Sequence, residues 1–125
     1  MSKDWRLRCK EHPNIMFGKA LSNARKRALK RGVPFQIDKE YLKDLYQSQS
    51  GKYYYSGLPL HVVKDESNVI DHFKMTLDCI DPNLGYIKGN VVWCSYCINS
   101  FKLKMSKEEM IQICISILEN NNIKL

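Results

Sequence analysis

Residues 75–102, MTLDCIDPNLGYIKGNVVWCSYCINSFK, constrain the fold more than any other segment of the chain. Side chains over 76–81 alternate between two faces, as they do in a short strand. The residues 81–90 are rich in turn formers, and 91–94 are a second extended run. After Cys94 the apolar spacing becomes helical. This order predicts a strand, a loop, a second strand and a helix in direct succession.

Two helices and a hairpin are predicted upstream of this segment. Apolar residues at helical spacing over 15–31 indicate an amphipathic helix, which Gly32 and Pro34 should end. Asp38 is positioned to cap a second helix. The tyrosines and valines of 53–63 lie among glycine turns, a pattern that favours strands.

The last predicted element is a helix at 106–120. Ser106 and Glu109 have the spacing of a capping box, which marks a helix start. Apolar residues then recur at i, i+3, i+4, i+7 and i+8, so we expect this helix to pack on the core. Cys114 is part of that apolar face and is expected to be a buried, inert thiol.

The chain is expected to form one α+β domain over residues 1–125. Its 44% apolar and 26% charged residues are an ordinary globular balance, and the length allows a modest core. Within the domain we distinguish a basic helical segment at 1–36, a hairpin with the strand–strand–helix unit at 52–104, and the terminal helix at 106–120.

The cysteines and the apolar runs indicate a cytoplasmic protein. Five cysteines without a secretory signal suggest free or metal-bound thiols in a reducing compartment. No apolar run approaches the roughly 20 residues that cross a bilayer, so no membrane partner is expected.

Positive charge is concentrated near the N-terminus. Residues 1–31 carry ten Lys and Arg against two acidic residues, whereas the rest of the chain carries ten basic and eleven acidic groups. This asymmetry favours a phosphate-binding surface, although a solvated basic helix face is the alternative. The predicted DNA contacts on the first helix are Arg25, Lys26, Arg27, Lys30 and Arg31.

The order of motifs in 75–104 resembles the ββα-metal motif of HNH endonucleases. LDCID falls on the first strand, GYIKGN in the loop, VVW on the second strand, and N-x-x-K on the helix. The chain is most similar to small phage HNH proteins and, more distantly, to phage junction resolvases. The resemblance implies an HNH-like core and hydrolysis of double-stranded or branched DNA in the cytoplasm of a phage-infected host.

The resemblance also implies a single metal site and its neighbours. Asp78 and Asn99 would be the two protein ligands of one Mg²⁺ or Mn²⁺, with water and phosphate completing the shell. Asn90 would tie the loop to the backbone and orient the residue at the base position. Lys102 and Lys104 would face the phosphate backbone.

The general base departs from the family pattern. Active HNH enzymes have a histidine directly after the metal-binding acid, where this chain has Cys79. A thiol with an ordinary pKa of about 8.5 is mostly protonated at neutral pH, so rapid hydrolysis is in question. His72 and His61 are the candidates to replace it.

Cys94 and Cys97 have the spacing of half a zinc site. A closed structural site needs four ligands. Cys9 and His12, or Cys79, could in principle contribute, but their spacing gives no independent support. Structural zinc is therefore not favoured over two small residues packing at the strand-to-helix corner.

Two functions of different classes follow from these observations. The first is a small metal-dependent HNH endonuclease acting on DNA. The second is a protein that keeps the fold and binds nucleic acid, or regulates a protein partner, without cutting. They differ in whether any group near a metal-bound water can accept its proton.

Overall fold

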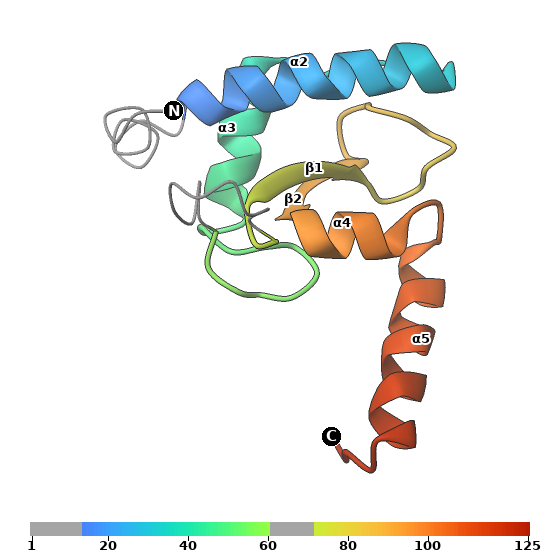
Figure 1. Cartoon of the computed structure of the whole chain (residues 1–125). Helices are drawn as coiled ribbons and strands as arrows, with labels where there is room; N and C mark the ends of the chain where they lie inside the picture. The colour runs from blue at the N-terminus through green and yellow to red at the C-terminus, as the bar shows by residue number, and fades with distance from the viewer. Residues whose placement is uncertain (1–13, 61–71) are drawn as a thin grey trace.

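The computed structural model of the chain describes residues 14–60 and 72–125 (Figure 1). Within these residues the protein is a mixed α+β structure with four helices and a two-stranded antiparallel sheet, which confirms the expected class. No helix of this part is long and apolar enough to span a bilayer. In chain order the elements are α2 (Asn14–Arg31), α3 (Lys39–Ser48), β1 (Met75–Cys79), β2 (Val91–Ser95), α4 (Tyr96–Lys102) and α5 (Lys107–Asn120).

The helix ends follow the capping signals in the sequence. α2 ends where Gly32 adopts a φ of +68°, a left-handed conformation that glycine tolerates best. The Asp38 carboxylate accepts a hydrogen bond from the Tyr41 backbone N–H at 2.8 Å and caps α3, as expected. Ser106 and Glu109 form the predicted capping box at the start of α5.

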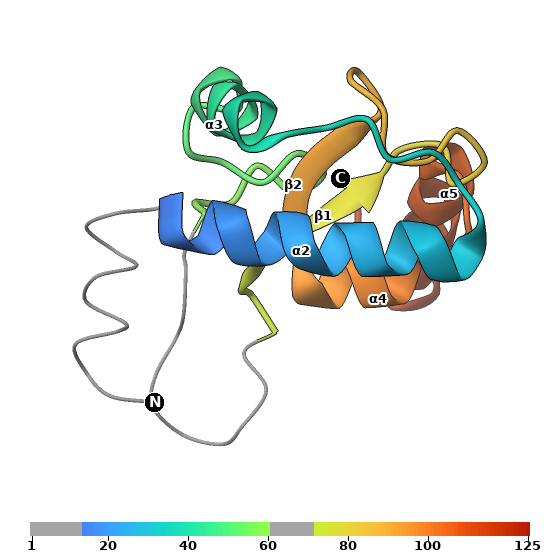
Figure 2. The same cartoon turned by 90° about the horizontal axis from the view of Figure 1, so that it is seen from above.

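β1 and β2 are the two strands predicted within 76–94, and they pair antiparallel, with Asp78 opposite Val92. The alternation along β1 points Thr76 and Asp78 toward α4, while Leu77 and Cys79 belong to the buried cluster that α2 covers. Figure 1 shows α2 above β1 and α4 below it, and the view from above shows the two helices running nearly parallel (Figure 2). The end of β1 therefore lies between two helices.

Trp93 of β2 is the centre of the core. It is fully buried, its ring lies 5.4 Å from that of Phe17, and its Nε1 donates to the Leu42 backbone oxygen at 3.2 Å. Gln49 exchanges hydrogen bonds with the Trp93 backbone, donating at 3.1 Å and accepting at 2.9 Å. These contacts fix α2 and α3 to the hairpin and so hold α2 near the end of β1.

The expected strands at 53–63 are not found where the chain is described. Residues 54–56 form a turn, Lys52 and Pro59 form one isolated bridge, and 61–71 lie outside the described residues. Tyr53 instead donates its hydroxyl to the Phe73 backbone oxygen. The tyrosines are held by side-chain contacts here, so strand propensity is overridden by tertiary packing.

The prediction that α5 packs on the core is wrong. The helix projects away from the rest of the molecule in Figure 1, and among its residues only Met110 is buried. Ile113 and Ile117 are 40% and 53% exposed, and Cys114 is an exposed thiol rather than a buried one. The apolar stripe does exist, but within the described residues the core covers only its first turn.

Candidate active site

A small cavity of about 100 Å³ lies at the end of β1, between α2 and α4. Asp78 and Cys79 reach it from β1, Asn99 from α4, and two arginines from α2. Residues that the sequence places far apart, and to which it assigns metal and phosphate contacts, therefore line one cavity. The arginines are Arg27 and Arg31.

Asp78 is buried and its Oδ2 is engaged by two side chains. The Tyr55 hydroxyl donates to this oxygen at 2.6 Å, and the Lys102 ammonium lies 3.3 Å from it. Burial, followed by the hydrogen bond to Asp78 and its charge, raises the pKa of Tyr55, so its hydroxyl keeps its proton and remains a donor. Both described polar contacts of the carboxylate go to Oδ2, which leaves Oδ1 for a ligand.

The hydrogen bonds donated by the Asn99 side-chain nitrogen fix the orientation of its amide. Nδ2 donates to the Thr76 hydroxyl at 3.2 Å and to the Leu77 backbone oxygen at 3.1 Å. A carbonyl oxygen can only accept, so the nitrogen must face it. The amide oxygen of Asn99 is therefore the atom available to a cation near Asp78.

Asn90 makes the backbone ties that the resemblance implies. Its Oδ1 accepts from the Asp81 N–H at 3.0 Å, and its Nδ2 donates to the carbonyls of Asp81 and Gly85 at 2.9 and 2.7 Å. Gly85 has a φ of +74°, and a Cβ there would lie 2.8 Å from the Pro34 backbone oxygen. The loop between the strands is thus held closed on itself and against the α2–α3 connection.

Cys79, at the expected base position, is buried and keeps its proton. Burial raises the pKa of the thiol, and the Asp78 charge adds to the rise. The Arg31 charge and hydrogen bonding to the Arg31 and Tyr86 side chains oppose the rise without cancelling it. The thiol is neutral at pH 7 and is a poor general base.

The structure does not bring His72 to the cavity. His72 is exposed, precedes β1, and its backbone oxygen accepts from the Cys97 N–H at 2.8 Å, whereas the cavity lies at the other end of the strand. His61, the other candidate base, lies outside the described residues.

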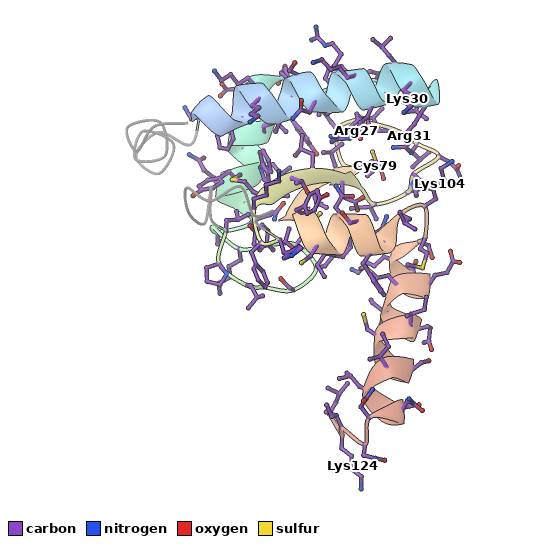
Figure 3. All side chains as sticks on the ribbon, viewed as in Figure 1. Arg27, Lys30, Arg31, Cys79, Lys104 and Lys124 are labelled. Atoms are coloured by element: carbon purple, nitrogen blue, oxygen red, sulfur yellow. The ribbon has the colours of Figure 1, made fainter. Side chains whose placement is uncertain are left out.

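The basic residues of α2 divide into two groups. Arg27 donates to the Tyr86 hydroxyl at 3.0 Å, and Arg31 donates to the Pro82 backbone oxygen at 2.9 Å, so both turn toward the cavity. Figure 3 shows them on α2 on the side of Cys79. The other three, Arg25, Lys26 and Lys30, are exposed on the helix. The Arg25 guanidinium lies 5.1 Å from the centre of the Phe35 ring.

The expectation that Lys102 faces the phosphate backbone is not met. Its side chain is fully buried and turned inward, with Nζ 3.1 Å from the Cys79 backbone oxygen as well as beside Asp78. The contact with the buried carboxylate offsets part of the cost of taking the ammonium out of water. Lys104 is exposed beyond α4, at the same end of the molecule as the two arginines (Figure 3).

The two thiols of the C-x-x-C pair lie at the strand-to-helix corner. Cys94 is buried beside Thr76, and burial raises its pKa to about 12. The Cys97 Sγ lies 3.4 Å from the Ser95 hydroxyl. Cys9 and His12 fall outside the described residues, so packing of the pair stays a prediction.

The donors at the cavity suit a hard cation. Asp78 offers a carboxylate oxygen and Asn99 an amide oxygen, the ligand types that Mg²⁺ prefers when it keeps most of its waters. Residues 14–60 and 72–125 contain no cluster of three His, Cys, Asp or Glu side chains that could hold a metal.

Sequence reasoning missed two members of the site. Tyr55, which hydrogen bonds Asp78, lies in a run of three tyrosines and nothing in the sequence separates it from its neighbours. Tyr86, which links Arg27 to the cavity, lies inside the GYIKGN motif, so the motif itself was the available signal.

Comparison with known proteins gives one informative similarity. No family model matches the sequence, and no solved structure matches it. The chain is 32% identical over 92 residues to an uncharacterized 29.0 kDa protein in the dda-modA intergenic region of Enterobacteria phage T4. The match covers 74% of this chain and 34% of the phage protein, so the chain spans about a third of its relative's length. The likeness is to a phage protein whose name states no activity.

Proposed function

We propose that this protein is a small HNH-type endonuclease, phage-encoded, that hydrolyses DNA phosphodiester bonds with a divalent metal. The observation that carries the proposal is that Asp78 and Asn99 line the same cavity as Arg27 and Arg31. A carboxylate and an amide for a cation, together with two guanidinium groups for a phosphate, form the donor set that phosphoryl chemistry requires.

Each residue has a distinct part in this proposal. Asp78 and Asn99 would hold Mg²⁺ or Mn²⁺, which when bound supplies charge stabilisation for the phosphate and the leaving oxygen. Arg31 and Arg27 would bind and orient the phosphate, because a guanidinium presents paired donors to it. Asn90 keeps the loop closed beside them.

The absence of a good base among the described lining residues sets the expected rate. The cavity is lined by the neutral thiol of Cys79 and by no described histidine. Proton transfer would then go to bulk water or phosphate, without the roughly 10²–10⁴-fold gain of a positioned base. We expect slow, metal-dependent nicking.

The test is nicking of supercoiled plasmid with Mg²⁺ or Mn²⁺ against a chelator control. Asp78→Ala should abolish nicking because it removes the charged ligand, and Asn99→Ala should cost less because water can replace a neutral oxygen. Asp44→Ala, which removes an exposed carboxylate on α3, is the matched control and should nick like the parent. Equal nicking by the parent and Asp78→Ala would refute the assignment of the site.

A second function is favoured by a specific observation. The neutral, buried thiol of Cys79 supplies no good base, and the ammonium beside Asp78 opposes binding of a divalent cation, so both features would slow or prevent cutting. The protein would then bind DNA through its basic helix, or regulate a protein partner, without hydrolysis. Salt-dependent DNA binding with no nicking under either metal would select this function.

A further inference from the structure

Lys102 is the most deeply buried charged residue among the described residues. The proposed metal site assigns it no role, because the metal ligands are Asp78 and Asn99. Its side chain is fully buried, and its ammonium contacts the Asp78 Oδ2 at 3.3 Å and the Cys79 carbonyl at 3.1 Å. A buried ammonium is unfavourable unless it is paired, and a buried carboxylate is equally so. Each group therefore supplies what the other needs in the absence of a metal.

A divalent ion bound to Asp78 would meet this ammonium at short range. The Tyr55 hydroxyl, which contacts the same carboxylate, is neutral, and the other cations lining the cavity, Arg27 and Arg31, come from α2. Little solvent separates the charges, because Asp78 is only 6% exposed and Lys102 is 0% exposed. Like charges at such a distance repel strongly in a low-dielectric setting.

We propose that Lys102 is an internal counter-cation for Asp78 that competes with the divalent metal. It keeps the cavity charge-balanced and folded when no metal is bound, and it weakens metal binding when one is offered. The proposal rests on the assignment of Asp78 as a metal ligand. This role differs from that of a purely structural ion pair. If the pair were only structural, removing Lys102 would leave the metal affinity unchanged or would lower it.

The test is Mn²⁺ binding to the full-length chain, measured by the loss of the free Mn²⁺ electron paramagnetic resonance signal. We expect Lys102→Met to bind Mn²⁺ at least about tenfold more tightly than the parent, because the competing charge is removed from a buried site. Lys104→Met removes the same charge two residues away but at an exposed position, so its affinity should stay within about threefold of the parent. Asp78→Asn should lose this binding.

Fold loss is controlled by a second variant and a second readout. Lys102→Gln keeps a donor for the Cys79 carbonyl and should also bind Mn²⁺ more tightly than the parent. For both variants, Mn²⁺ should raise the unfolding temperature by more than it does for the parent, since binding to the native state stabilises it by mass action.

The outcomes separate this inference from the proposed function. Tighter Mn²⁺ binding by the Lys102 variants in a protein that never nicks DNA would support the competition and remove only the endonuclease. Equal or weaker binding by folded Lys102 variants, or no Asp78-dependent binding in any variant, would overturn the inference even if the parent nicks DNA.

Discussion

Replacement of Cys79 is the sharpest test of how the cavity handles protons. The thiol is 3% exposed, and burial raises its pKa. A free thiol is only about 3% thiolate at pH 7, and this one is less ionised still. Cys79→Ser keeps the size and the polarity of a neutral group, so it should change the nicking rate by less than about twofold.

Cys79→His supplies the group that the thiol does not. A positioned base is typically worth about 10²–10⁴-fold, and we expect the lower end because the imidazole must fit beside Arg31 in a cavity of about 100 Å³. The larger ring should cost about 1–3 kcal/mol in the free energy of unfolding. The nearby guanidinium disfavours the imidazolium, which keeps the ring in its proton-accepting form at pH 7.

The assay is single-turnover nicking between about pH 5.5 and 8.5, with urea unfolding followed by tryptophan fluorescence (Trp5 and the buried Trp93) as the folding control. The rate for Cys79→His should rise with pH through the imidazole pKa and then level off, whereas the parent and Cys79→Ser should give low rates throughout. A tenfold or greater loss in Cys79→Ser would refute the neutral-thiol argument. A folded Cys79→His that is no faster than the parent would show that this position does not serve as the base.

Three further results are expected. Ile117→Ser on α5 should change the free energy of unfolding by less than about 1 kcal/mol, since the side chain is 53% exposed; a loss of 2–5 kcal/mol would mean that the helix is packed after all. If Cys94 and Cys97 only pack, purified protein should carry well under one zinc per chain, and a chelator should not lower its melting temperature; one zinc per chain by elemental analysis would contradict this. Replacing Lys26 and Lys30 with Ala should weaken DNA binding for all sequences and flatten the salt dependence by up to about 0.9 per lost phosphate contact; an unchanged slope would assign these charges to solubility.

Local signals predicted the helices because their causes are local. Asp38 caps α3 through a backbone N–H three residues away, and Ser106 with Glu109 caps α5 in the same way. The antiparallel pair is almost as local, because its two strands follow one another in the chain and are joined by the turn-rich loop 80–90. These elements can be predicted because no distant residue is needed to explain them.

The parts that were not predicted depend on which surfaces meet. The apolar stripe of α5 shows that one face of the helix is apolar, but not what covers it, and Ile113 and Ile117 are exposed in the described structure. The resemblance implied that Lys102 faces the phosphate backbone, and only the position of Asp78 across from α4 explains its burial. Arg31 likewise lines the cavity only because α2 packs beside the end of β1, and local sequence signals do not predict that packing.

The hydrogen bonds of the Asn90 side chain restrict the length of the loop between β1 and β2. Asn90 and Asp81 are nine residues apart and hold the loop ends together through both the amide oxygen and the amide nitrogen. If a residue were deleted between them and the strands shifted by one to compensate, every side chain of β1 would change faces. Asp78 would then turn away from Asn99, so insertions and deletions in this loop should be far less tolerated than substitutions at its exposed positions.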